Sequence, residues 1–143
     1  MCSSGSLCHV YLNARRHQLE LREVVSLYPS LISSLLAHPG IWLVIGRDDE
    51  SVVIFGREGL LAVNGEIQRE GRDPLREIPY ARWAAQQIAR VARFRSSGDL
   101  ILMGAYDADT QRVACFEEQW ACHGGLGGPQ DMAFFMAGPE VPW

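Results

Sequence analysis

The chain has 143 residues, of which 48% are hydrophobic and 21% are charged, a composition typical of one globular domain and not of a disordered chain. Its formal net charge is −4 and the basic residues are scattered among acids, which argues against a surface for nucleic acid. No apolar run approaches the roughly 20 residues of a membrane span, and the start MCSSGSLCHVYLN has neither region of a signal peptide. The sequence therefore predicts a single domain without a nucleic-acid partner or a membrane segment, located by default in the cytoplasm.

The first half of the chain alternates strand and helix patterns. Residues 7–12 (LCHVYL) predict a strand, with no earlier element to pair with it. Helical spacing of the apolar residues over 20–37 predicts a helix, which Pro29 splits into two. Apolar strands are predicted at 41–46 and 51–56, and the polar residues between them predict a hairpin.

The second half continues this alternation. Asn64-Gly65 is the strongest turn signal in the sequence and predicts a hairpin between strands at 60–63 and 66–69. Pro79 opens a predicted helix that runs to about Phe94. Further strands are predicted at residues 99–104, 112–117 and 132–137. Together these patterns predict one α/β domain over residues 1–143, a mixed sheet with flanking helices and a central antiparallel meander.

The stretch ACHGGLGGPQD at residues 121–131 places His123 directly before a glycine-rich loop. Glycines allow the backbone to approach a ligand closely, and histidine serves as a metal ligand or a general acid. An ordinary surface loop is the alternative, because zinc needs three or four convergent ligands. HGGLGG matches neither the phosphate-binding loop of nucleoside triphosphatases nor the dinucleotide-binding fingerprint, since Pro129 and a predicted strand follow it.

The dipeptide Cys-His occurs twice, at Cys8-His9 and at Cys122-His123. Four such side chains suit a tetrahedral zinc site, but their separation by more than a hundred residues and the alternating direction of neighbours in a strand argue against one, and coincidence is the alternative. The cysteines form no CxxC pair, and nothing in the sequence indicates secretion, so reduced thiols are expected.

Several segments, in order along the chain, resemble one family. They are SSGSLCHVYL, LYPSLISSLLAHPGIWLVIGR, GRDPL, GDLIL and, above all, ACFEEQWACHGGLGGPQ. Over nearly its whole length the chain is similar to the C-terminal portion of bacterial type I phosphodiesterase/nucleotide pyrophosphatase-like proteins, which belong to the alkaline phosphatase superfamily. The ending DMAFFMAGPEV also resembles the closing strand of that superfamily.

The resemblance implies a metal-dependent hydrolase of phosphoric esters. In that superfamily two divalent metals, usually zinc, lie at the carboxyl ends of sheet strands and clamp the attacking and leaving oxygens while a Thr or Ser nucleophile attacks phosphorus. One metal ligand is a late histidine before a glycine-containing loop, a position that His123 matches. The resemblance further implies that Gly124 and Gly125 belong to the substrate-pocket loop, where bulk would crowd the metal or the phosphate.

The sequence departs from the family at its start. The family's nucleophile and six of its seven metal ligands lie upstream of the SGxLxHVY-like strand with which this chain begins. We therefore expect a partial domain without a catalytic nucleophile, inactive alone, whose complete relatives act on phosphate esters and are membrane-tethered. Two alternatives stay open. One is a non-enzymatic module that covers exposed strand edges and one apolar sheet face by forming a homo-oligomer, and the other is a split enzyme completed by an N-terminal chain.

Overall fold

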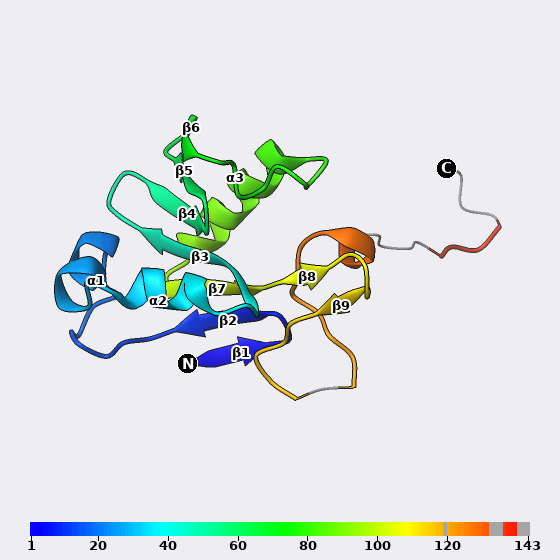
Figure 1. Ribbon diagram of the computed structural model, residues 1–143, viewed down its shortest axis with the longest axis horizontal. Helices are drawn as coiled ribbons and strands as arrows, with labels where there is room; N and C mark the ends of the chain where they lie inside the picture. Colours follow the sequence, from blue (N-terminus) through cyan, green and yellow to red (C-terminus); the bar gives the residue numbers. More distant parts are fainter. Residues whose placement is uncertain (119, 132–135, 140–143) are drawn as a thin grey trace.

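The computed structural model describes residues 1–118, 120–131 and 136–139. A seven-stranded sheet is the middle layer, with α3 on one face and α1 and α2 on the other (Figure 1). The elements are β1 (Cys2–Ser4), β2 (Leu7–Val10), α1 (Leu21–Leu27), α2 (Leu31–Ala37), β3 (Ile41–Arg47), β4 (Val52–Gly56), β5 (Gly59–Val63), β6 (Ile67–Gly71), α3 (Ala81–Ala92), β7 (Leu100–Gly104), β8 (Tyr106–Asp107), β9 (Arg112–Val113) and the 3-10 helix η1 (Gly128–Asp131). Among these residues, none of the helices combines the length and apolar character that a bilayer crossing requires.

The sheet has the strand order β1-β2-β7-β3-β4-β5-β6, so β7 enters between strands formed much earlier in the chain. Every strand pair in the described residues is antiparallel. The α/β class and the meander from β3 to β6 are therefore confirmed, but the prediction of a mixed sheet is wrong. The reason is that the helical crossovers join strands of equal direction, β2 to β3 and β6 to β7, and these strands are not neighbours.

The expectation that nothing precedes the first predicted strand is also wrong. β1 pairs with β2, with Cys2 opposite His9 and Ser4 opposite Leu7. Gly5 makes the turn between the two strands with a φ of 63°. Because β1 has three small or polar residues and no apolar alternation, its sequence carries no strand pattern.

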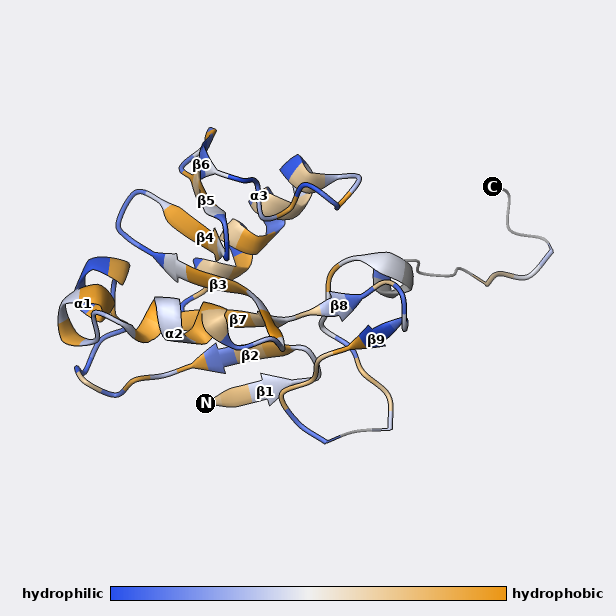
Figure 2. Cartoon of the chain, in the orientation of Figure 1, coloured by the Kyte–Doolittle hydropathy of each residue, from blue (hydrophilic) through white to orange (hydrophobic). Residues whose placement is uncertain are grey.

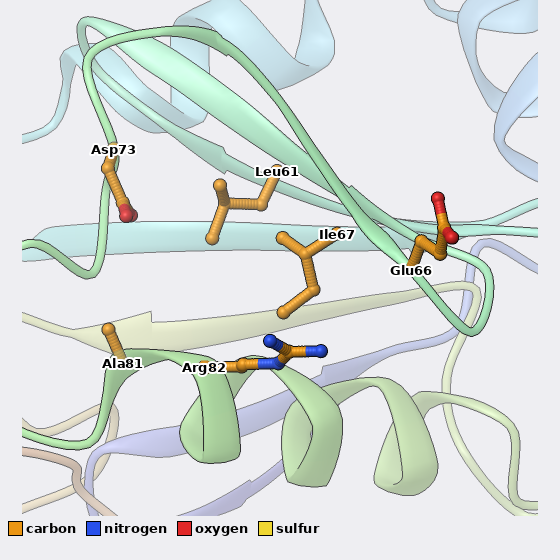
Figure 3. Close-up of a pocket in the computed structure, with 6 residues that line it drawn as sticks. All are labelled: Leu61, Glu66, Ile67, Asp73, Ala81 and Arg82. Atoms are coloured by element: carbon orange, nitrogen blue, oxygen red, sulfur yellow. The ribbon is translucent and has the colours of Figure 1, made fainter.

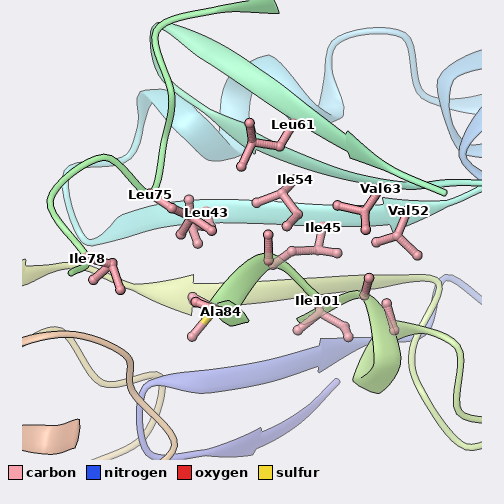
Figure 4. Packing of buried hydrophobic residues seen from close by; sticks show 14 residues of the cluster. Leu43, Ile45, Val52, Ile54, Leu61, Val63, Leu75, Ile78, Ala84 and Ile101 are labelled. Carbon is pink, nitrogen blue, oxygen red and sulfur yellow. The ribbon is translucent and has the colours of Figure 1, made fainter. Parts of the chain in front are cut away.

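Alternating side chains divide the core between the two faces of the sheet. Figure 4 shows Leu43, Ile45 and Ile101 of the sheet in one cluster with Ala84 of α3. The buried residues of α3 are Ala84, Ala85, Ala89 and Ala92. Their small side chains let this helix lie close to the sheet while its charged side chains face outward.

The opposite face of the sheet is covered by α1, α2 and the segments that connect them. Val44, Leu100 and Leu102 form its centre, with Val24 of α1 buried against them. Leucine and isoleucine side chains of α2 complete the cover, and Figure 2 shows this helix as largely hydrophobic. β7 is buried along its whole length, so the centre of the sheet is covered on both faces.

The last third of the chain has less regular structure than the sequence predicts. Only Arg112–Val113 of the predicted strand at 112–117 is extended in β9, which pairs with β8 in a hairpin. After β9, Phe116 N donates a hydrogen bond of 2.9 Å to the carbonyl of Gly5 in the β1–β2 turn. This bond directs the chain away from the β8–β9 hairpin. Most of the predicted strand at 132–137 lies outside the described residues.

Candidate functional site

The glycine-rich loop of residues 121–128 lies at one end of the sheet. The register places Leu7 opposite Met103 and Ile41 opposite Gly104, so the β1–β2 turn, the start of β3 and the end of β7 share this end. The loop reaches it through a hydrogen bond of 3.0 Å from Ser6 N to the His123 carbonyl. The structure therefore brings the segment carrying the candidate histidine to the first turn of the chain.

Two glycines make this contact possible. A Cβ on Gly5, at a φ of +63°, would lie 2.2 Å from the His123 carbonyl oxygen. A Cβ on Gly124, at a φ of +77°, would lie 2.7 Å from the Ser4 carbonyl oxygen. Gly124 thus has a packing reason to be small that does not require a metal or a substrate. Gly125, the other glycine of the predicted pocket loop, is half-buried.

Glu117 secures the same turn, and sequence reasoning missed it. Its Oε1 accepts a hydrogen bond of 2.7 Å from Gly5 N, and its Oε2 accepts one of 3.4 Å from the Ser3 hydroxyl. These partners are more than a hundred positions away, so no local pattern could have identified the carboxylate as an anchor.

His123 combines a fixed backbone with an exposed side chain. Its carbonyl is bound to Ser6 and enclosed by Gly5, whereas its imidazole makes no hydrogen bond within the described part of the chain. A histidine held in this way can coordinate an ion or move a proton without reorganising the loop that carries it. Both roles predicted for His123, metal ligand and general acid, require such an accessible imidazole on a fixed backbone.

The described residues do not form a metal centre by themselves. Within them, no three or more histidine, cysteine, aspartate or glutamate side chains come close enough together to hold an ion. Burial, the neighbouring Cys122 thiol and the Glu117 carboxylate raise the pKa of Cys115 to about 11. Without a metal ion, that thiol is therefore protonated at neutral pH. These residues do not fit the two-metal site of the resembled family without ligands from elsewhere.

The repeated Cys-His dipeptide does not make a four-ligand site in the described residues. Cys8 is fully buried in the core on the α1 and α2 face, and its burial raises the pKa of the thiol. The Nδ1 atom of His9 accepts a hydrogen bond of 3.0 Å from Gly98 N. Packing accounts for Cys8 and a backbone hydrogen bond accounts for His9, so neither side chain needs a metal to explain its position. Coincidence then explains the repeated dipeptide.

The far end of the glycine-rich loop lines a cleft. Gly127 and Gly128 form one wall of a cavity with a volume of about 650 Å³. Gly127 N donates to Oδ2 of Asp131 at 2.5 Å, and Leu126 packs against the core on the α3 face. Gly128 lies so close to Tyr106 that a Cβ at this position would approach the ring to 2.5 Å. The loop therefore extends from the β1–β2 turn to the edge of this cleft.

A second cleft, of about 540 Å³, lies between α3 and the β5–β6 hairpin. Figure 3 shows Arg82 extending from α3 beneath Ile67, with Asp73 and Glu66 on either side. Its two carboxylates outnumber its single guanidinium, so its charge does not favour an anion.

No protein-family model, curated protein or solved structure matches this chain.

Proposed function

We propose that this chain is the C-terminal segment of a metal-dependent phosphodiesterase and that His123 supplies one metal ligand. The observation that carries the proposal is the combination at His123 of an anchored backbone with an exposed imidazole. The resemblance of ACFEEQWACHGGLGGPQ to the phosphodiesterase family supplies the reaction class. The other metal ligands and the nucleophile come from a different segment or chain.

On this proposal the described segment has a binding role and not a complete catalytic one. A single imidazole gives little metal affinity, because zinc sites in proteins use three or four ligands. Transfer through a covalent intermediate also needs an activated nucleophile. On the proposal the chain alone is therefore inactive toward phosphate diesters, and its contribution is to orient one metal ligand and to form part of the pocket wall beside it.

The first test is the native mass of the protein that contains the peptide CHGGLGGPQDM in its source cells. The proposal expects either a species much larger than 15.9 kDa or a complex with a second chain. Zinc content and hydrolysis of bis(p-nitrophenyl) phosphate are then measured on that native form. His123→Ala should lower zinc affinity at least tenfold and abolish hydrolysis, whereas the control His38→Ala should change neither.

Two results would contradict the proposal. One is a native form that hydrolyses the diester equally well with and without His123. The other is zinc-dependent turnover by the chain of 143 residues alone, since the proposal assigns it no nucleophile.

A partner-binding module is the second candidate, and the two edge strands favour it. Within the described sheet, β1 and β6 are the edge strands and each pairs with one other strand, so their outer backbone groups are not used in the sheet. Arg69 and Glu70 place opposite charges on β6, which discourages indiscriminate pairing. Light scattering on the purified chain tests this candidate: a discrete dimer supports it, and a monomer at high micromolar concentration counts against it.

A further inference from the structure

The cleft beside Gly127 and Gly128 has walls that the proposed phosphodiesterase role does not use. The start of β3, the β4–β5 turn, the segment 72–78 and β8 form these walls. A volume of about 650 Å³ lies within the range of about 300–1,000 Å³ that is usual for small-molecule sites. The chemistry of the lining therefore indicates what kind of molecule would fit.

Two of the three arginines in the cleft already have acidic partners. Arg72 pairs with Glu58, and Arg76 pairs with Glu77, each at 2.8 Å. With three arginines and two glutamates, the lining keeps one positive charge. The remaining cation is Arg57.

Arg57 holds its charge in a fixed orientation. Its Nε donates to the Leu36 carbonyl and one terminal nitrogen donates to the His38 carbonyl, both at 3.1 Å. These carbonyls lie at the end of α2, and no carboxylate among the described residues forms an ion pair with this guanidinium. The other terminal nitrogen makes no hydrogen bond within those residues, so the guanidinium has donors left for an anion.

Flat apolar side chains accompany this charge. Trp42 at the start of β3 and Tyr106 of β8 both line the cleft and are half-buried. The close approach of Gly128 limits the positions that the Tyr106 ring can take. Pro39, Pro74 and Ile78 extend the apolar lining. Aromatic walls of this kind bind planar groups by stacking and by burial of apolar area.

We propose that this cleft is a binding site for a small organic anion with a negatively charged head and a flat apolar body. The head binds the Arg57 guanidinium, and the body lies between Trp42 and Tyr106. This site goes beyond the proposed function, because it requires neither a metal nor His123. It also assigns a role to the arginine at the β4–β5 turn that the sequence pattern alone does not show.

The test is a titration with phenyl phosphate, followed through the NMR signals of the Trp42 indole and the Arg57 Nε–H. An excess of EDTA is present, so that failure of the metal proposal cannot affect the result. We expect saturable binding with a Kd of about 5 mM or lower, in keeping with the affinity that a ligand of this size usually reaches. Inorganic phosphate, which lacks the apolar body, should bind at least about tenfold more weakly.

Arg57→Gln should weaken phenyl phosphate binding by about tenfold or more, because a charge-assisted hydrogen bond is lost. Arg57→Lys keeps the charge but lacks the planar guanidinium, so its affinity for phenyl phosphate should lie between those of the wild type and Arg57→Gln. Arg82→Gln removes an arginine that is also exposed, from the second cleft, and should bind phenyl phosphate like the wild type. Circular dichroism and a urea melt establish that each variant is folded.

Three results would overturn the proposal. The first is the absence of saturable binding by the folded wild type. The second is an equal loss of affinity in Arg57→Gln and Arg82→Gln, which would indicate a general effect of charge. The third is equal affinity for inorganic phosphate and phenyl phosphate, which would remove the role of the aromatic walls.

Discussion

Replacement of Asp99 by alanine should be among the most destabilising single changes in this chain. Asp99 is 5% exposed and lies at the end of the sheet opposite the glycine-rich loop, just before β7. Its Oδ2 accepts from Leu12 N at 2.7 Å, and its Oδ1 accepts from Leu19 N at 2.6 Å. One carboxylate thus fixes both ends of the irregular segment between β2 and α1.

The expected loss follows from those two bonds. Each hydrogen bond to a charged group contributes about 1.5–3 kcal/mol, so Asp99→Ala should lower the free energy of unfolding by about 3–6 kcal/mol. Asp99→Asn keeps one good acceptor and should lose about 1.5–3 kcal/mol. A domain with about 5–15 kcal/mol of total stability could be largely unfolded by the alanine variant.

Urea unfolding measures the effect. With a slope of about 1–3 kcal/mol/M, the midpoint of Asp99→Ala should fall by about 1 M or more. Asp109→Ala is the matched control, since Asp109 is exposed in the β8–β9 hairpin and should change stability by less than about 0.5 kcal/mol. If both variants unfold at the same urea concentration, the assignment of Asp99 as the anchor of this segment is incorrect.

Three further predictions concern other parts of the molecule. Burial lowers the pKa of His9, so the unfolded chain takes up this proton at a higher pH than the folded chain, and stability should fall as the pH drops below about 6.5. His9→Asn keeps an acceptor for Gly98 N but does not titrate, so the urea midpoint of this variant should depend less on pH between about 7 and 5.5. If the midpoint of the variant changes with pH as much as that of the wild type, the pH dependence comes from other groups. Gly5→Ala should lower the free energy of unfolding more than Gly65→Ala does. Both glycines have a positive φ, but only a Cβ at position 5 would meet the His123 carbonyl. Hydrogen exchange of the Ser6 amide, which donates to that carbonyl, should accelerate in Gly5→Ala alone. Gly128→Ala should displace the Tyr106 ring and weaken phenyl phosphate binding at least about threefold, and an unchanged NMR titration would exclude Tyr106 as a wall of the anion site.

Local patterns predicted most of the regular elements. The apolar run at 51–56 and the Asn64-Gly65 turn act over a few residues, and the two predicted hairpins, β3–β4 and β5–β6, are both confirmed. Pro29 separates α1 from α2, as its missing N–H requires. β1 was not predicted, and β9 is shorter than the predicted strand at 112–117. Both strands are defined by the neighbouring strand with which they pair and not by apolar alternation in their own sequence.

The candidate site was predictable only in part. The sequence ACHGGLGG singled out His123 because glycines beside a histidine are an unusual local combination, but it did not predict that the loop backbone is anchored at Ser6. Nothing in the sequence around Glu117 or Arg57 indicated that one secures the first turn and the other faces the cleft. Their roles depend on segments that become neighbours only when the sheet is complete.

By itself, the sequence determined the α/β class, the meander and the approximate extent of the helices, because periodicity, proline and turn residues act through nearby backbone geometry. Only the tertiary structure decided that β7 lies between β2 and β3, which makes the sheet antiparallel. That insertion makes contacts between residues 80 or more positions apart and brings Asp99 to Leu12 and Leu19. It also places the β1–β2 turn beside the end of β7, where the glycine-rich loop lies. Such contacts are selected by the burial of both sheet faces at once, a condition that no short stretch of sequence contains.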